Sequence, residues 1–248
     1  MTSYHGGKQR LGKKLAEIIV DTSLDIAEDE NWEIKGYCEP FCGMLGVYRH
    51  IPGFFEDEEC YDLKYLAGDA NGSVIKMWQA AKKGWKPPKV CSEKKFNKLK
   101  KSKGDSAEKG YIGHQYSFGG QWFNCYAPKY GKTKNSSKAS ENVTQISKDL
   151  KDVKFKKGSY IDLYSNLEGF VIYCDPPYDN SYSKYKVEFD SKTFWKWCKK
   201  MSEHNIIFVS NYKAPRGTEL VYKTNYKLTG SKKHMTSNNK RVEKLYVL

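Results

Sequence analysis

The four consecutive residues Asp175, Pro176, Pro177 and Tyr178 are suited to gripping an amino group. A residue before proline is kept out of the helical region, and proline has a fixed φ and no N–H, so this segment is predicted to be a stiff loop. The Asp175 carboxylate and the Pro176 carbonyl oxygen can each accept a hydrogen bond, which fits the two N–H donors of an exocyclic amine. The Tyr178 ring offers a flat face on which a nucleobase that carries such an amine could stack. The alternative is an ordinary turn, because turns favour aspartate and proline.

This loop directly follows the apolar run 170–174, which is typical of a buried parallel strand. A second buried run, 206–209, ends in Ser210, Asn211 and Tyr212. Open α/β sheets bind ligands at the carboxyl ends of their strands. The loop is therefore predicted to stand where such a sheet has its site.

Two earlier strands are predicted to end in acids. The strand at 35–38 leads into Glu39 and a glycine-containing turn, and a helix follows through residues 47–51. The strand at 65–68 ends in Asp69, where an acid can accept hydrogen bonds from both ribose hydroxyls of a nucleotide-like ligand. The alternative for Asp69 is the N-cap of the next helix, although Asn71 could itself supply that cap.

The segment from Tyr4 to Lys8 contains a glycine pair and precedes a predicted amphipathic helix over residues 11–19. A glycine pair lets the backbone come close to a ligand. A lysine at a helix start opposes the helix dipole, which points to another role for Lys8, such as binding a carboxylate. The alternative is a flexible N-terminus with a chance glycine pair.

The positive charge of the chain is concentrated in one segment. The formal net charge is +14, and residues 82–157 contain 20 lysines, no arginine and 6 acids, while the rest of the chain is balanced. This distribution predicts a polyanionic partner, nucleic acid before a membrane surface. Lysine without arginine favours phosphate contacts over bidentate reading of bases. The alternative is a solubilising lysine-rich surface.

Within this basic segment, residues 111–128 are nearly uncharged and rich in aromatic and amide side chains, which suit contact with bases and sugars between phosphates. The alternative is a small satellite core. Residues 132–140 are predicted to form a mobile loop, and residues 143–150 a short helix. The side chains predicted to contact nucleic acid are Tyr116, Phe118, Gln121, Trp122, Asn124, Lys129, Lys132 and Lys134.

After this segment, residues 153–155 and 159–162 are predicted to form a strand that ends in Asp162. Residues 194–201 predict a helix with a buried apolar face, and 220–228 and 242–248 predict two antiparallel strands. The seven cysteines include no CxxC pair, so we expect reduced thiols, no metal site and an intracellular location. No apolar stretch is long enough to span a membrane.

The order of these motifs resembles the Dam-like, D12-class DNA N6-adenine methyltransferases, which use S-adenosylmethionine. The resemblance covers most of the chain. It is carried by the aromatic-x-Gly-Gly-Lys segment Tyr4 to Lys8, the acidic-x-Phe-x-Gly segment Glu39 to Gly43, Asp69, the basic insertion, the loop at 175–178, Ser210-Asn211, and the Glu-x-Leu-Tyr segment Glu243 to Tyr246.

The resemblance implies a Rossmann-like class I methyltransferase sheet with helices on both faces. It implies a catalytic domain of residues 1–81 and 153–248 and a target-recognition insertion of residues 82–152. Asp175, Pro176 and Tyr178 would hold the target adenine of double-stranded DNA. The residues that would hold S-adenosylmethionine are Tyr4, Gly7, Lys8, Glu39, Phe41, Cys42, Gly43, Asp69, Asp162 and Asp175.

Other interpretations stay open. The same loop chemistry would serve a methyltransferase acting on an amino group of RNA adenine or guanine, or on cytosine N4. A catalytically inactive nucleic-acid-binding protein of the same fold is a second alternative, and a lysine-rich membrane-surface protein a remote third. A monomer and a homodimer are both compatible with the sequence.

Overall fold

The fold is taken from a computed structural model of the 248-residue chain. It describes residues 4, 6–60, 62–127, 134–150, 152–177, 189–227 and 240–248, with only the backbone described at 134–136, 226, 227, 240 and 241.

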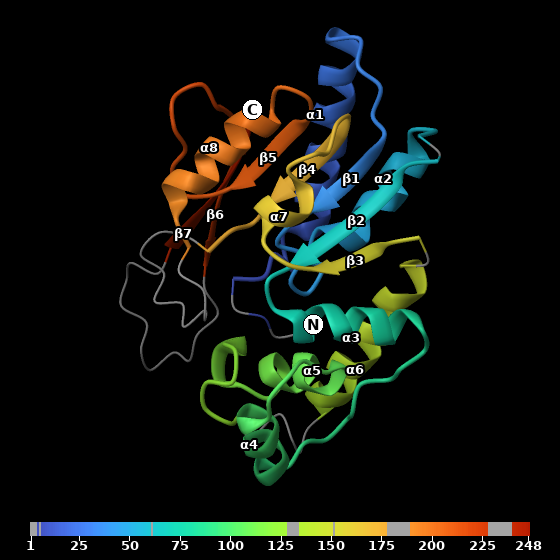
Figure 1. Cartoon of the computed structure of the whole chain (residues 1–248), viewed down its shortest axis with the longest axis vertical. Helices are drawn as coiled ribbons and strands as arrows, with labels where there is room; N and C mark the ends of the chain where they lie inside the picture. Colours follow the sequence, from blue (N-terminus) through green and yellow to red (C-terminus); the bar gives the residue numbers. More distant parts are fainter. Residues whose placement is uncertain are drawn as a thin grey trace.

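A seven-stranded sheet in the order β3-β2-β1-β4-β5-β7-β6 forms the centre of the molecule (Figure 1). Strands β1 to β5 run parallel, whereas β7 is antiparallel to both β5 and β6. The order reverses between β1 and β4, which is where open sheets of this kind bind ligands. The predicted α/β fold with a Rossmann-like sheet is confirmed. The strands are β1 Gly36–Glu39, β2 Lys64–Asp69, β3 Lys154–Lys157, β4 Phe170–Cys174, β5 Ile206–Ser210, β6 Glu219–Lys227 and β7 Lys240–Val247.

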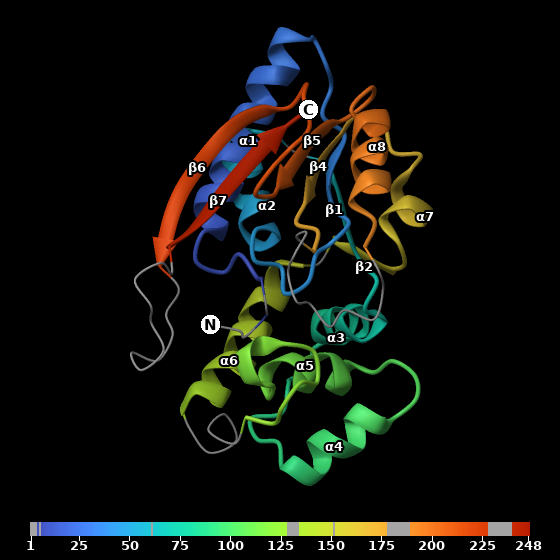
Figure 2. The same ribbon diagram turned by 90° about the vertical axis from the view of Figure 1, so that its left-hand side faces the viewer.

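Helices cover both faces of the sheet. Figure 2 shows α1 and α2 on one face and α7 and α8 on the other. Residues alternate between these faces along β4: Val171 and Tyr173 join the core under α1, and Ile172 and Cys174 join the core under α8. The helices are α1 Gly12–Asp29, α2 Ile51–Asp57, α3 Gly72–Lys82, α4 Glu93–Lys101, α5 Ala107–Gln115, α6 Lys134–Ile146, α7 Tyr160–Tyr164 and α8 Ser191–Met201, with 3₁₀ turns at Tyr48–His50, Phe118–Gly120 and Ser147–Asp149.

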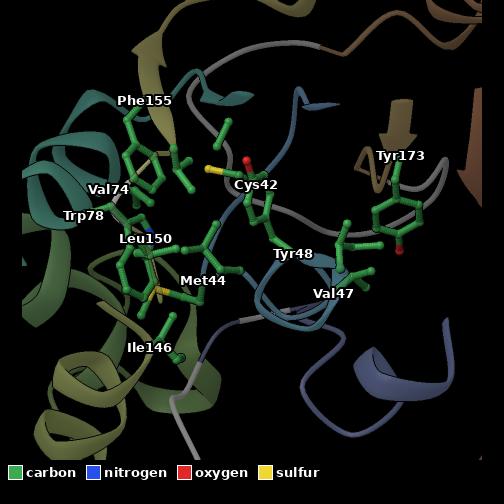
Figure 3. Packing of buried hydrophobic residues seen from close by; sticks show 14 of the residues in the cluster. Cys42, Met44, Val47, Tyr48, Val74, Trp78, Ile146, Leu150, Phe155 and Tyr173 are labelled. Carbon is green, nitrogen blue, oxygen red and sulfur yellow. The ribbon is translucent and has the colours of Figure 1, made fainter. Parts of the chain in front are cut away.

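The basic segment 82–152 forms helices α4, α5 and α6 below the carboxyl ends of the strands (Figure 1). Ser92 and Ser106 cap α4 and α5 by accepting hydrogen bonds from backbone N–H groups. Its buried side chains are continuous with those of the sheet. Figure 3 shows Ile146 and Leu150 of this segment gathered with Met44 and Trp78. The predicted catalytic domain and the predicted insertion therefore share one hydrophobic core.

Two local predictions were wrong. Residues 159–162 do not extend a strand, because β3 ends at Lys157 and the Ser159 hydroxyl accepts the backbone N–H of Ile161, which starts α7. Residues 134–140 belong to α6 rather than to a loop. Ala139 and Val143, one turn apart, are buried in the core and give this polar helix its apolar side.

All seven cysteines are free thiols. Among the described residues, the helices are too short or too polar to cross a bilayer.

The contact between α5 and α3 predicts a measurable packing effect. A Cβ at Gly110 would overlap the carbonyl oxygen of Ser73, whereas a Cβ at the exposed Gly53 in α2 would meet nothing within 4 Å. Both glycines are helical, so the gain in helix propensity from alanine is shared. We expect Gly110→Ala to lower the free energy of unfolding by about 1–3 kcal/mol. Gly53→Ala should raise it by about 0.5–1 kcal/mol.

Urea unfolding of both variants measures these changes. If Gly110→Ala were as stable as Gly53→Ala, the close packing of α5 on α3 would be contradicted.

Candidate active site

The parallel strands bring three predicted acids to one edge of the sheet. Glu39 is the last residue of β1, Asp69 the last of β2, and Asp175 directly follows β4. Strand β1 pairs with both β2 and β4, so the three acids stand on neighbouring strand ends. They flank the point at which the strand order reverses.

Lys8 forms an ion pair with Asp175 across this edge. The Lys8 Nζ donates to Asp175 Oδ1 at 2.6 Å, and the two side chains are 8% and 19% exposed. The Lys8 backbone is itself fixed, because its carbonyl oxygen accepts the N–H of Leu11 at 3.1 Å and its N and C atoms pack against Gly46. The predicted pairing of Lys8 with a carboxylate is present in the structure.

Glu243 also contacts Lys8, although it is not among the site residues predicted from the sequence. Its Oε1 lies 3.5 Å from the Lys8 Nζ, and its side chain is 2% exposed. Along β7, Glu243 occurs in phase with Leu245 and Val247, both buried in the core. An acid in the core-facing phase of a strand is the sequence signal that could have identified it.

Glu39 is buried and held by its own neighbourhood. The Tyr37 hydroxyl donates to Glu39 Oε1 at 2.7 Å, and the backbone N–H of Tyr48 donates to the same carboxylate. Burial raises the pKa of Glu39 well above its usual range, and the nearby Asp175 acts in the same direction. Glu39 thus anchors the turn that follows β1.

Asp69 binds the same turn from the neighbouring strand. Its two carboxylate oxygens accept the backbone N–H groups of Gly43 at 3.0 Å and Asn71 at 2.7 Å. Burial raises the pKa of Asp69 to about 6, and these two N–H donors oppose that rise. Asn71 is the N-cap of α3, since its side chain accepts the N–H of Ser73, so Asp69 is not the cap.

Tyr4 covers the turn and touches the basic segment. A Cβ at Gly43, whose φ is +43°, would lie 2.9 Å from the Tyr4 ring, so the close approach requires glycine. The same ring lies 4.5 Å from that of His114 in α5, which in turn lies 4.9 Å from Trp122. Gly7 donates its N–H to the Tyr4 carbonyl oxygen at 3.2 Å and keeps this segment folded.

The remaining predicted cofactor residues lie in different surroundings. Phe41 packs against Tyr160 and Phe194 between α7 and α8. Cys42 is buried, and its N–H donates to the carbonyl oxygen of Gly68 at 2.8 Å. Asp162 is exposed in the first turn of α7, not at the end of a strand.

Of the loop after β4, Pro176 is buried beside Asp175, and Tyr178 lies outside the described residues. Whether Tyr178 offers a stacking face stays a prediction.

The predicted nucleic-acid residues differ in exposure. Phe118 is 64% exposed at a tight turn, whereas Tyr116 is 1% exposed and its hydroxyl donates to the Pro88 carbonyl oxygen. Tyr116 would have to leave the core to contact a base. In this structure its ring packs in the core beside the turn at Phe118–Gly120. Gln121 and Asn124 are hydrogen-bonded to each other at 2.8 Å, and Trp122 packs on His114.

Of the three predicted lysines, Lys129 and Lys132 lie outside the described residues. Lys134 begins α6, with its side chain not described.

Residues 121–237 match the family model described as D12 class N6 adenine-specific DNA methyltransferase. The match confirms the resemblance predicted from the sequence. It includes the loop at 175–178, whereas the motifs at 4–8, 39–43 and 69 lie before it.

Among solved structures, the chain is similar to SMU.472, a proposed methyltransferase complexed with SAH, at 12% identity and a TM-score of 0.35. The alignment covers 98% of this chain but 54% of that one, so the chain spans about half the length of the protein it matches. No curated protein matched.

The carboxyl groups of Asp69 and Asp105 should titrate on opposite sides of the usual aspartate pKa. Burial gives Asp69 a pKa of about 6. Hydrogen bonds from Lys157 and Ser73 lower the pKa of Asp105 below its usual value. Because the native state of Asp69 holds its proton to higher pH than the unfolded state does, this group favours folding less as pH rises through about 6.

Carboxyl carbon chemical shifts recorded by NMR against pH test this prediction. The Asp69 midpoint should fall near 6, and the amide signals of Gly43 and Asn71 should move with it. An Asp69 midpoint as low as that of Asp105 would contradict the raised pKa of Asp69.

Proposed function

We propose that this chain, whose residues 121–237 match the D12 class N6 adenine-specific DNA methyltransferase family model, transfers a methyl group from S-adenosylmethionine to the N6 amino group of adenine in specific double-stranded DNA sequences. The single observation that carries the proposal is the placement of Asp175, directly after β4 at the reversal point of the sheet, with Lys8 beside it. The protein would act inside the cell, wherever its DNA is.

The residues at the strand ends fit the cofactor. S-adenosylmethionine supplies a methyl group on a positively charged sulfur. Carboxylates at the ends of β1, β2 and β4 suit its positive charges and its ribose hydroxyls. Gly43 in the left-handed region and the Tyr4 ring above it form a close backbone turn of the kind that admits a nucleoside. We assign cofactor binding to Tyr4, Gly7, Lys8, Glu39, Phe41, Cys42, Gly43, Asp69, Asp162 and Asp175.

The loop after β4 would activate the acceptor. The lone pair of an adenine amino group is delocalised into the ring, so this nitrogen is a weak nucleophile. Hydrogen bonds from its two N–H groups to the Asp175 carboxylate and the Pro176 carbonyl oxygen favour a pyramidal nitrogen whose lone pair faces the methyl group. Positive charge then develops on nitrogen beside a carboxylate, which lowers the barrier. Alignment of the reacting atoms supplies much of the remaining acceleration.

Reaching the amino group requires the adenine to leave the base stack. Unstacking costs a few kcal/mol, which stacking on Tyr178 would partly offset. The segment 82–152 lies below the strand ends and would contact DNA. Exposed lysines of α4 would bind phosphates, and the turn at 118–124 would face the bases with Phe118, Gln121, Trp122 and Asn124.

Replacing the acid of the loop tests the chemistry. We expect Asp175→Ala still to bind S-adenosylmethionine through the other nine assigned residues, and to lose about 10²–10³-fold or more in the rate of methyl transfer, because one acceptor of the amino group and its charge are gone. Methyl incorporation into duplex DNA is measured together with cofactor affinity by calorimetry. Asp57→Ala, at an exposed acid that ends α2 outside the basic segment, is the matched control and should keep the normal rate.

Near-normal turnover of Asp175→Ala would contradict the assignment. Identifying the methylated nucleoside separates adenine N6 in DNA from cytosine N4 and from RNA bases. A wild-type chain that binds no S-adenosylmethionine would favour a DNA-binding protein without activity.

The basic segment predicts a steep salt dependence. Lys94, Lys98 and Lys101 are exposed on α4, and each phosphate contact contributes about 0.9 to the slope of log K against log salt. The triple change of these lysines to glutamine should reduce the slope by about 3 × 0.9, measured by fluorescence anisotropy with duplex DNA.

A matched control removes the same charge at Lys196, Lys199 and Lys200, which are also exposed. They belong to α8, which lies at the other end of the molecule from α4 (Figure 1). Equal losses from both triple variants would show that net charge alone, and not the α4 surface, governs binding.

A further inference from the structure

We propose that Glu243 is a positioning residue for methyl transfer: it shares the Lys8 ammonium with Asp175 and so leaves part of the Asp175 carboxylate for the substrate amine. This inference rests on the proposed function and adds to it a residue on β7, on the far side of β5 from the loop that holds Asp175.

The distances place the ammonium between two carboxylates. The Lys8 Nζ lies 2.6 Å from Asp175 Oδ1 and 3.5 Å from Glu243 Oε1, with the Gly6 carbonyl oxygen at 3.4 Å. An ammonium has three donors, so it can serve both acids at once. The shorter contact to Asp175 shows which acid it favours in this structure.

Burial makes the position of Glu243 costly without a partner. Its side chain is 2% exposed and occupies a core-facing phase of β7 that Leu245 and Val247 continue. An isolated buried carboxylate would cost several kcal/mol, and a hydrophobic residue of similar size would serve stability at least as well. An acid here is therefore better explained by its contact with Lys8 than by packing.

The backbone fixes the Glu243 carboxylate more firmly than the lysine. Strand β7 pairs with β5 on one side and β6 on the other, with Glu243 opposite Thr224. The N–H of Asn211 also donates to the Lys244 carbonyl oxygen at 3.2 Å. Lys8 carries its charge on a flexible four-carbon stem. Glu243 is thus the fixed acceptor, and the ammonium can move toward it.

This arrangement matters when the substrate arrives. The amine of adenine and the ammonium of Lys8 would both donate to Asp175, and a cation held close to this carboxylate weakens it as an acceptor for the amine. With Glu243 present, the ammonium has a second acceptor and Asp175 can turn one oxygen to the amine. Without Glu243, Lys8 would remain on Asp175 and weaken its hydrogen bond to the reacting nitrogen.

The titratable groups that interact with the Lys8–Asp175 pair come from three strands. Glu243 on β7 lies beside Lys8, whereas Tyr173 on β4 and Glu39 on β1 interact with Asp175. Tyr173 is buried, which raises its pKa well above the usual range, and its hydroxyl is hydrogen-bonded to Ser210 Oγ at 2.8 Å. Tyr173 is therefore uncharged near neutral pH, and the charge balance lies between Lys8 and the three acids.

Two opposite substitutions make the test specific. Glu243→Gln removes one acid, leaves the ammonium to Asp175, and should move the acid limb of the pH–rate profile to lower pH. Lys8→Met removes the ammonium, leaves Asp175 facing Glu39 and Glu243, and should move that limb to higher pH. Glu243→Gln should slow single-turnover methyl transfer to duplex DNA by about 10–100-fold while cofactor affinity stays within about threefold.

Conservative and distant variants complete the design. Glu243→Asp should restore part of the rate and return the acid limb toward that of the wild type. Glu219→Gln, at an exposed acid that begins the neighbouring β6, should leave rate and pH profile unchanged. Thermal unfolding of every variant controls for folding, and if Glu243→Gln is unfolded, the Glu243→Asp and Lys8→Met profiles decide alone.

The two proposals fail in distinguishable ways. If the wild type methylates adenine and the acid limb stays in place in both Glu243→Gln and Lys8→Met, or if rate losses merely follow losses of thermal stability, the positioning role is overturned while the proposed function stands. If the wild type transfers no methyl group to adenine in DNA, the proposed function is overturned, and the positioning role with it.

Discussion

The ion pair between Lys8 and Asp175 is the interaction on which the rest of the site depends. It joins residues 167 positions apart, so it forms only when the N-terminal segment, β4 and the sheet between them are all in place. Buried ion pairs contribute little net stability, because desolvation of both charges offsets their attraction. Its position at the reversal point of the sheet is better explained by chemistry than by stability. Local structure serves it too, since Gly12 and Gly46 meet so closely that a side chain on Gly12 would displace the start of α1 from the turn beside Lys8.

The same N-terminal segment connects the two halves of the molecule. Tyr4 lies against Gly43 on the sheet side and against His114 on the side of the basic segment. Helix α3 makes a second connection, since α5 packs directly on it and Asp105 bonds both Ser73 and Lys157. A ligand that orders the turn after β1 therefore acts on residues that also support the α5 turn. Under the proposed function, cofactor binding and DNA recognition would share this structural path.

Much of this arrangement could be predicted from the sequence, for identifiable reasons. Short apolar runs that end in Glu39, Asp69 and Asp175 specify buried parallel strands, and parallel strands necessarily bring their carboxyl ends together. The prediction that the strand continues through residues 159–162 was wrong because it included Ser159 in the strand. The Ser159 hydroxyl instead caps α7. The polar start of α6 has weak local preference for a helix, and its order comes from Ala139 and Val143 in a distant core.

Glu243 and Tyr116 show a different limit. The sequence places Glu243 in a strand and Tyr116 in a basic segment, but composition does not predict which way either side chain faces. Tertiary packing decides that Glu243 turns inward to Lys8 and that Tyr116 turns away from the surface. Periodicity along β7 contains the first of these signals, since Glu243 follows the phase of Leu245 and Val247. The second has no local signal, because aromatic residues serve cores and base contacts equally well.

The acids that the sequence assigns to ligand binding are first of all acceptors for the protein's own backbone. Asp69 accepts the N–H groups of Gly43 and Asn71, and Glu39 accepts that of Tyr48. These bonds fix the turn before any ligand arrives, so the carboxylates are oriented at no further entropic cost when one binds. Each carboxylate oxygen has a second lone pair, so holding the turn does not exhaust its capacity. Asp175, the acid proposed to receive the substrate amine, pairs with the ammonium of Lys8, whose flexible stem allows this donor to shift when a substrate donor arrives.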